Sequence, residues 1–409
     1  MSMKLLSLFE KWSQTSLVLR ILIGLIIGAV LGLTVPHWTA IDILGVVFVS
    51  ALKAIAPILV AVLVTASIAK AGNGLGPRFR TVISRYLLST FIAALCAVVG
   101  SFMFPLTLQL SHTMDQAAPG TITDIFTDLI ANMVINPMMS VTQANYIGIL
   151  FWAILTGIAL KMKASQQTIN VVSDISEVIT QTVKWVVQFA PFGIMGLVFS
   201  SVSESGLEVF TTYGHLVLLL VGCMMVNTFI FNPLISFLML RRNPYPLLFT
   251  CLKESGLQAF FTRSSAANIP INLNLCKKLG LDEEFYSVSI PLGATINMDG
   301  AAVTITVMTL AVAHTVGIEV SFVSALFLGF IATLAACGAS GVAGGSLMLV
   351  PMACSFFNIS NDVAIQAVAV GFIIGVVQDS VETALNSSGD VFFTATAEYY
   401  DRKKKSHKG

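Results

Sequence analysis

Charged side chains are scarce in this chain. Asp, Glu, Lys and Arg make up 11% of its 409 residues, whereas soluble domains carry about 25%. Hydrophobic residues reach 56%, above the roughly 45–50% of soluble domains. The composition excludes an ordinary soluble protein and predicts a multi-pass protein of the lipid bilayer. A formal net charge of +1 leaves no basic excess for binding nucleic acid.

Two further absences narrow the function. The six cysteines stand singly in apolar runs without a Cys-x-x-Cys pair, so they are interpreted as small buried hydrophobes. The histidines show no metal-ligand spacing, and no cofactor is expected. No cleavable signal peptide is evident; residues 1–20 are amphipathic and are predicted to lie on the cytoplasmic membrane surface.

Long apolar runs are what the chain has in abundance. A helix needs about 20 residues to cross a hydrocarbon core of about 30 Å. Eight runs reach a comparable length and predict an all-α polytopic fold with eight transmembrane helices, near residues 18–36, 43–69, 81–109, 131–160, 172–200, 212–240, 284–313 and 362–397.

Lys and Arg are unevenly distributed among the connections. They occur at residues 70–85, 161–163, 241–242, 277–278 and 402–408. They are absent from residues 110–130, 201–211, 314–320 and 357–362. Because basic loops stay on the cytoplasmic side of a membrane, both termini are predicted to be cytoplasmic.

Two apolar segments are interrupted near the middle and are too polar there to span. In residues 246–278 the polar stretch surrounds Arg263, and in residues 321–357 a glycine-rich stretch covers 337–346. Each arm of about 12 residues reaches about 18 Å, roughly the bilayer midplane. The first segment has basic flanks and the second has none. This predicts two re-entrant helical hairpins that enter from opposite faces, as in inverted-repeat transporters with a midplane site.

One side of the last predicted helix is polar. At about 100° per residue, five of its side chains fall within a stripe roughly 100° wide. Carboxylates at membrane depth cost about 2.5–3.5 kcal/mol each, so they usually face a cavity and handle ions or polar substrates. The alternative is a salt-bridged structural stripe. The five residues are Asp379, Glu382, Thr383, Asn386 and Asp390.

A second polar motif, Gly-Ala-Thr-Ile-Asn-Met-Asp-Gly at residues 293–300, interrupts another predicted span. Backbone carbonyls freed there, with the oxygens of Asn297 and Asp299, suit a hard cation such as Na⁺. The alternative is a buried hydrogen-bonded kink. Arg263 alone cannot neutralise the four carboxylates of these motifs, so bound cations or protons must supply the remaining positive charge.

The tip of the first hairpin is predicted to bind an anion. Ser264 and Ser265 begin its second arm, where free N–H groups and the positive end of the helix dipole suit a carboxylate. Arg263 beside them favours this interpretation. The alternative is that one serine serves only as a helix N-cap.

Together these motifs resemble those of the dicarboxylate/amino acid:cation symporters over nearly the whole chain. The resemblance rests on Thr262 to Ser265, on residues 293–300, on Gly341-Val342 and on residues 379–390. It implies the glutamate transporter-homologue fold: a homotrimer of elevator type, with a fixed scaffold and a moving transport domain in each subunit. The implied scaffold is 1–80 and 131–211, and the implied transport domain is 81–130 and 212–409.

The resemblance also implies which residues bind. Those for the amino acid are Arg263, Ser264, Ser265, Val342, Ser346, Asp379, Glu382, Thr383 and Asn386. Those for a first sodium ion are Gly293, Asn297, Asn386 and Asp390. A second sodium ion would take Thr295 with the carbonyls of Ala336, Cys337 and Ala339. A third would take Tyr86, Ser89, Thr90, Asn297 and Asp299.

Departures from the acidic-substrate members of that family bear on the substrate. Glu382 stands where those members carry Arg, and Ala301 where they carry Thr. In a poorly solvated pocket, a glutamate repels a substrate's second carboxylate by several kcal/mol. A substrate with a small hydroxyl side chain can instead donate a hydrogen bond to the glutamate. Many relatives have Pro where this chain has Ala343, so the tip of the second hairpin, which would close over the substrate as a gate, is predicted to be looser.

We therefore predict uptake of L-serine and L-threonine by symport with sodium across the bacterial cytoplasmic (inner) membrane. Proton coupling is the main alternative, because the buried carboxylates could titrate. A passive channel is another alternative; it would need no coupling ion and would not accumulate substrate against a gradient. An intramembrane hydrolase is disfavoured, because no His or Cys lies in the polar stripe.

Overall fold

The structure is a computed structural model that describes residues 15, 17–70, 77–110, 133–143, 145–206, 208–337, 339 and 344–406. Within these residues the chain is helical and contains no strand, in agreement with the predicted all-α class. The first helices are α2 (Leu17–Thr34), α3 (Asp42–Lys70), α4 (Pro77–Met103), α6 (Pro137–Thr142), α7 (Tyr146–Lys163), α8 (Gln166–Gln188) and α9 (Ala190–Ser205). The later helices are α10 (Glu208–Val226), α11 (Asn232–Leu240), α12 (Tyr245–Cys251), α13 (Leu257–Thr262), α14 (Ser265–Lys278), α15 (Glu283–Ile296), α16 (Asp299–Thr315), α17 (Phe322–Ala336), α18 (Val350–Ser355) and α19 (Asn361–Ser406). Short turns of other helix types are η1 (Thr39–Ile41), η2 (Asn227–Phe231), η3 (Leu252–Gly256) and η4 (Leu347–Leu349).

Four helical stretches in the described part of the chain are long and apolar enough to cross a membrane. They are Arg78–Met103, Phe210–Leu240, Glu283–Thr315 and Asn361–Lys405. They match four of the predicted spans. Shorter apolar helices cover parts of the first two predicted spans.

Two of the predicted spans each contain two helices in the structure. The run at 172–200 is divided between α8 and α9, which bend by 50° at Phe189. The cause is Pro191 in the first turn of α9, which has no N–H to continue the hydrogen-bond ladder of α8. The run at 131–160 contains α6 and α7, each begun by an asparagine side chain that accepts backbone N–H groups of its first turn.

The segment from Tyr245 to Lys278 folds back on itself at Arg263. Arg263 has φ 51°, a left-handed conformation that is uncommon for a residue other than glycine. Beyond this turn, Asn268 Nδ2 donates to Ser255 Oγ at 2.9 Å, and Lys278 Nζ lies 2.6 Å from Glu254 Oε2. Both contacts join the second arm to the neighbouring residues Ser255 and Glu254 of the first arm, so the two arms lie side by side.

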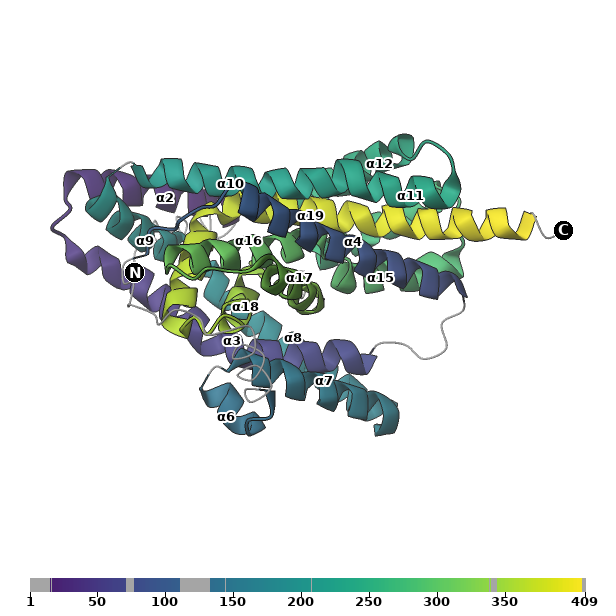
Figure 1. Cartoon of the computed structure of the whole chain (residues 1–409), viewed down its shortest axis with the longest axis horizontal. Helices are drawn as coiled ribbons and strands as arrows, with labels where there is room; N and C mark the ends of the chain where they lie inside the picture. Colours follow the sequence, from purple (N-terminus) through teal and green to yellow (C-terminus); the bar gives the residue numbers. More distant parts are fainter. Residues whose placement is uncertain are drawn as a thin grey trace, which may run out of the picture.

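The predicted second hairpin contains α17, η4 and α18, and residues 340–343 of its tip lie outside the described residues. The helices form two groups that touch each other (Figure 1). In one group α2, α3, α7, α8 and α9 pack together, and in the other α4, α10 and the later helices surround α16 and α19. Residues 299–313 of α16 are all buried, so this helix lies at the centre of the second group.

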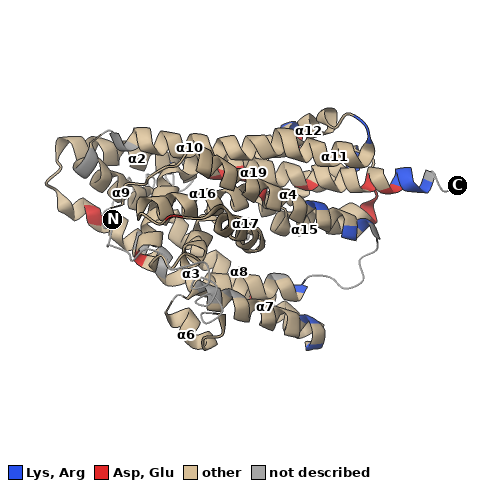
Figure 2. Ribbon diagram, viewed as in Figure 1, with Lys and Arg blue, Asp and Glu red and all other residues tan. Residues whose placement is uncertain are grey.

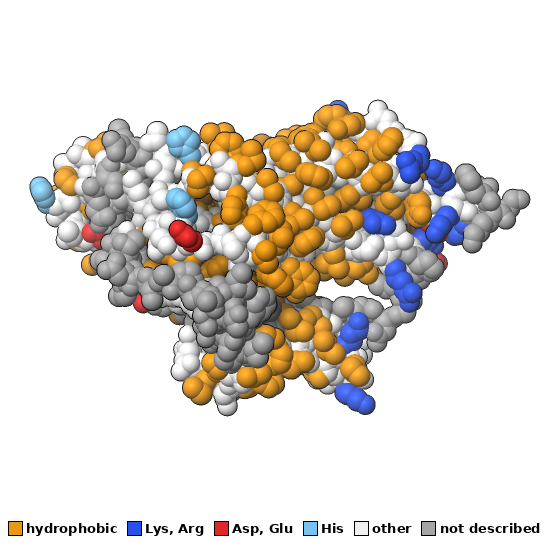
Figure 3. All heavy atoms as spheres, viewed as in Figure 1, with side chains coloured by type: hydrophobic (Ala, Val, Ile, Leu, Met, Phe, Trp, Pro, Cys, Tyr) orange, Lys and Arg blue, Asp and Glu red, His pale blue; other side chains and the backbone are white. Residues whose placement is uncertain are grey.

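Basic residues are unevenly distributed along the long axis of the molecule. Most Lys and Arg gather toward the end where α19 finishes, whereas Asp and Glu occur toward both ends (Figure 2). Between the ends, hydrophobic side chains cover a broad band of the visible face (Figure 3). The exposed large hydrophobic residues include Leu218, Ile230 and Leu238. Such a band suits contact with lipid acyl chains.

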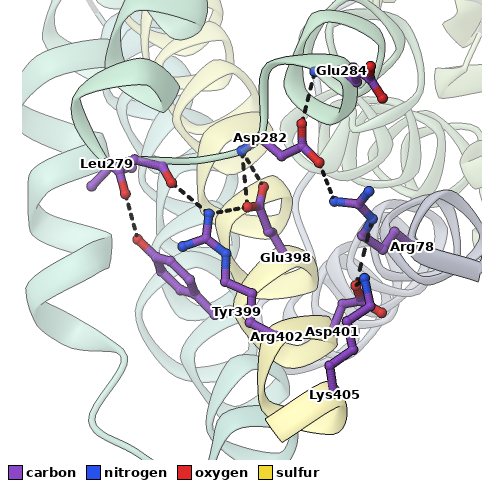
Figure 4. Close-up of polar contacts among 10 residues, drawn as sticks. Arg78, Leu279, Asp282, Glu284, Glu398, Tyr399, Asp401, Arg402 and Lys405 are labelled. Atoms are coloured by element: carbon purple, nitrogen blue, oxygen red, sulfur yellow. Dashed lines mark hydrogen bonds and ion pairs between the residues drawn. The ribbon is translucent and has the colours of Figure 1, made fainter.

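An ionic cluster ties three elements together at the basic end (Figure 4). Arg78 at the start of α4 donates to Asp282 Oδ2 at 2.7 Å and lies 3.7 Å from Asp401 Oδ2. Glu398 of α19 is 1% exposed, accepts the backbone N–H of Asp282 on both oxygens and pairs with Arg402. The cluster therefore fixes the connection between α14 and α15 against α4 and α19.

Candidate functional site

The five side chains of the polar stripe are all buried on α19. Their exposed fractions lie between 0% and 6%. The stripe meets three other parts of the chain: the break between α15 and α16, the turn at Arg263, and the start of η4. Each member of the stripe, except Thr383, contacts one of these parts through its side chain. Thr383 instead donates from Oγ1 to the carbonyl of Asp379 on its own helix, at 2.8 Å.

Asn297 closes α15 and reaches directly into the stripe. Its Nδ2 donates to Asp390 Oδ1 at 3.1 Å and to the carbonyl of Asn386 at 3.0 Å. From the other side of the break, the backbone N–H of Gly300 donates to Asn386 Oδ1 at 2.8 Å. The side chains predicted for the first sodium site are therefore brought together around the unwound turn.

Two oxygens of this group have no hydrogen-bond donor among the described residues. They are Asn297 Oδ1 and Asp390 Oδ2, and both are buried. A buried oxygen left without a donor is costly, and two such hard oxygens are ligands that suit Na⁺. Gly293 keeps the space open, because a Cβ there would lie 2.8 Å from Asp390 Oδ1. The donor set therefore fits a small hard cation.

Asp299 lies in a separate polar pocket between α16, α4 and the π-helical turn η2. It accepts from Ser89 Oγ and from Thr90 Oγ1, the latter at 3.1 Å. Asn227 Nδ2 and Asn232 Nδ2 also donate to it, at 2.8 and 3.0 Å. Four side chains thus stabilise this buried carboxylate, and no basic residue in the described part of the chain pairs with it.

Tyr86, the remaining member predicted for the third sodium site, lies against the first site instead. Its hydroxyl donates to the carbonyl of Asp390 at 3.0 Å and is 2.9 Å from Thr394 Oγ1. The structure therefore places Asp299 with Ser89 and Thr90, and places Tyr86 and Asn297 beside Asp390.

Asp379 connects both hairpins. Arg263 Nε and Nη2 each lie 2.7 Å from Asp379 Oδ2. The backbone of Gly344, just past the tip of the second hairpin, lies near this carboxylate. An ion pair that is buried on both sides is thus formed between the turn of the first hairpin and α19.

Glu382 is held by hydrogen bonds to a single oxygen. Thr304 Oγ1 and Ser346 Oγ donate to Oε2 at 2.7 and 2.9 Å, and Gln378 Nε2 donates to the same atom. Among the described residues none donates to Oε1. The side chain is 5% exposed, so this carboxylate is fixed in place with one oxygen unengaged.

The second predicted sodium site is only partly assembled. Cys337 Sγ lies 3.9 Å from the carbonyl of Ile296, so the end of α17 is next to the end of α15. Ala336 and Ala339 share this turn, since the N–H of Ala339 donates to the Ala336 carbonyl at 2.9 Å. However, Thr295 is exposed and donates to the carbonyl of Leu292 on its own helix.

The serines at the first turn have different positions. Ser264 is the N-cap of α14, since its Oγ accepts the N–H of Ala267 at 3.2 Å. The capping alternative for Ser264 is therefore realised in the structure. Ser265 is buried at 2% exposure. Val342 lies outside the described residues.

Several polar residues of the site escaped the sequence analysis. Asn227 and Asn232 are five residues apart, so they do not share a face of a regular α-helix, and only the π-turn η2 brings both to Asp299. Thr304 lies just beyond the 293–300 motif and Gln378 directly precedes Asp379, and an uncharged side chain beside a motif is a weak signal. A polar residue within an apolar span is nevertheless the signal that could have identified all four.

Comparison with known proteins gives the family. The pattern of the sodium:dicarboxylate symporter family matches residues 17–399. The serine/threonine transporter SstT of Bifidobacterium adolescentis is 55% identical over 390 residues, which are 95% of this chain and 91% of that protein. The serine/threonine transporter SstT of Streptococcus thermophilus is 53% identical over 395 residues, 96% of this chain and 98% of that protein. These relatives are named as transporters and not as enzymes. The chain belongs to the sodium:dicarboxylate symporter family, as its motifs predicted.

Proposed function

We propose that the protein takes up L-serine and L-threonine together with Na⁺ across the bacterial cytoplasmic membrane. Sodium symport follows the family, and the substrates follow the names of the relatives. The observation within this chain that carries the substrate assignment is the fixed carboxylate of Glu382. It faces the polar site with Oε1 unengaged among the described residues.

The pocket is proposed to select by side chain through Glu382. A serine or threonine hydroxyl donates to Oε1, and this charge-assisted bond is worth about 1.5–3 kcal/mol. A second carboxylate placed 4 Å from Glu382 is repelled by about 4 kcal/mol at an effective dielectric constant of about 20. Aspartate and glutamate are thus disfavoured.

The rest of the amino acid is held by groups common to all amino acids. Asp379 receives the ammonium group, and Ser265 with Asn386 serves the carboxylate. Backbone groups of both hairpin tips complete the enclosure, from Arg263 on one side and from Val342 on the other. Ser346 and Thr383 line the pocket between them.

Sodium is proposed to bind at the oxygens left unsatisfied by the protein. Asn297 Oδ1 and Asp390 Oδ2 provide the best supported site, with the Gly293 carbonyl and Asn386 beside them. The Asp299 pocket offers a second carboxylate. Thr295 with the turn at 336–339 would complete a further site once its hydroxyl turns away from its own helix.

The architecture proposed for this function is a homotrimer with eight spans and two re-entrant hairpins per subunit. The two packing groups support a division into scaffold (1–80 and 131–211) and moving transport domain (81–130 and 212–409). The basic end of the molecule supports a cytoplasmic C-terminus. The predicted position of the N-terminus lies outside the described residues.

Proton coupling is the alternative that the buried carboxylates support. To separate the two, the protein is reconstituted in liposomes, and labelled L-serine uptake is driven first by an inward Na⁺ gradient and then by a proton gradient alone. The proposal expects concentrative uptake with Na⁺ only. Uptake driven by protons without Na⁺ would refute sodium coupling, and uptake that never exceeds equilibrium would indicate a channel.

A further inference from the structure

Arg263 is the only Lys or Arg among the described residues that is buried, with 6% of its surface exposed. Its side chain does not point to solvent from the hairpin turn but enters the site and pairs with Asp379. Asp379 is also the group proposed to receive the substrate ammonium. A cationic group of the protein therefore occupies the position that a cationic group of the substrate requires.

The Arg263–Asp379 ion pair does not form all the hydrogen bonds that an arginine–carboxylate pair can form. An ideal arginine–carboxylate pair uses two nitrogens on two oxygens, whereas here Nε and Nη2 share the single oxygen Oδ2. In addition, Arg263 Nη1 is buried and has no hydrogen-bond partner among the described residues. The guanidinium is thus bound along one edge, with unused donors on another.

We propose that Arg263 is an internal substitute for the substrate ammonium, and that an amino acid displaces it from Asp379 on binding. This inference rests on the proposed function and adds to it a residue that sets affinity. The substrate is a zwitterion, so it supplies an ammonium to Asp379 and a carboxylate to the displaced guanidinium. Charge is balanced before and after the exchange.

The exchange has a consequence for the transport cycle. A carrier must return empty after each delivery, and an unpaired buried carboxylate would oppose that passage through the bilayer. When Arg263 pairs with Asp379, its guanidinium neutralises this carboxylate in the empty site, as the substrate ammonium does in the loaded site.

By occupying Asp379, the Arg263 guanidinium also weakens substrate binding. When only a fraction of the protein has a free Asp379, the apparent Kd rises by the inverse of that fraction. If Arg263 occupies Asp379 nine-tenths of the time, its removal lowers the Kd for serine about tenfold. Removal should therefore tighten binding while slowing the return of the empty carrier.

The test compares Arg263→Gln and Arg263→Lys with the wild type in the full-length protein. Arg80→Gln is the matched control, because Arg80 is an exposed residue of α4 distant in sequence from the site motifs. Three quantities are measured: the Kd for L-serine at fixed Na⁺ in detergent, serine–serine exchange in liposomes, and net Na⁺-driven serine uptake. Exchange needs only the loaded carrier to move, whereas net uptake also needs the empty return.

For Arg263→Gln we expect a Kd lower by about tenfold and a ratio of net uptake to exchange lower by about tenfold than in the wild type. Arg263→Lys keeps a cation with fewer donors, so its Kd should fall less and net uptake should persist. An unchanged or higher Kd in both variants would overturn the inference. Equal losses of exchange and net uptake would also overturn it, since that pattern indicates a purely structural arginine.

Two further outcomes are distinguished by the design. If Arg263→Gln does not fold, Arg263→Lys decides alone: a lower Kd with net uptake retained supports displacement, and an unchanged Kd contradicts it. If the wild type itself fails to take up serine with Na⁺, the proposed function is refuted. Wild-type uptake with an unchanged Kd in the variants refutes only the displacement.

Discussion

Replacing Glu382 with glutamine tests how the pocket recognises its substrate. The amide keeps one oxygen for the three donors that now reach Oε2, from Thr304, Ser346 and Gln378. Its NH₂ group then stands where Oε1 was. The substitution therefore preserves the shape of the side chain and removes both the charge and the acceptor offered to a substrate hydroxyl.

The size of the effect follows from the kind of hydrogen bond that is lost. A bond to a charged group contributes about 1.5–3 kcal/mol and a bond between neutral groups about 0.5–1.5 kcal/mol. The difference of about 1–1.5 kcal/mol corresponds to roughly a tenfold higher Kd for serine. Removing the charge also removes a repulsion of about 4 kcal/mol toward a second carboxylate, so aspartate should begin to compete.

The assay is titration calorimetry at saturating Na⁺ with L-serine and L-alanine, which differ by one hydroxyl. Glu382→Gln should weaken serine about tenfold and leave alanine nearly unchanged. The difference between the two ligands isolates the hydroxyl contact from any general disturbance of the pocket. Equal losses for both ligands, or no loss for serine, would refute the contact between Glu382 and the substrate hydroxyl.

Three further substitutions test other parts of the account. Asp379→Ala should abolish serine binding in calorimetry and, because it leaves Arg263 buried without a partner, cost about 3–5 kcal/mol of stability; retained binding would contradict the ammonium site. Asp390→Asn should raise the Na⁺ concentration for half-maximal uptake about tenfold or more, and an unchanged value would exclude Asp390 as a ligand. The hydrogen bond from Arg78 holds the pKa of Asp282 below its usual range, so its stabilisation is present above about pH 4 and is lost as the pH falls through the lowered pKa. The difference in unfolding midpoint between wild type and Arg78→Gln should therefore shrink below about pH 4, and a difference that is constant from pH 3 to pH 7 would contradict this.

The sequence predicted best what depends on periodicity. The helical period placed Asp379, Glu382, Asn386 and Asp390 on one side of a helix, and in the structure all four are buried. The break at 297–298 was also predicted, since Asn297 and Asp299 interrupt an apolar run there. Local pattern is sufficient in these places because the signal is confined to one helix.

Contacts between distant segments could not be predicted in the same way. Arg263 and Asp379 are 116 residues apart, and the pattern did not show that the two side chains would pair. Asn227 and Asn232 meet Asp299 only because a π-turn changes the period of their helix. The bend between α8 and α9 was missed because Pro191 lies inside the stretch 172–200 that was predicted as one span.

The most direct test of the account is the dependence of serine binding on Na⁺. The central claim is that substrate and sodium share one buried site whose free oxygens and carboxylates are completed by both. Calorimetry of L-serine at low and high Na⁺, with choline as the balancing cation, should show a Kd that falls steeply as Na⁺ rises. A Kd that is the same at both Na⁺ concentrations would contradict the claim.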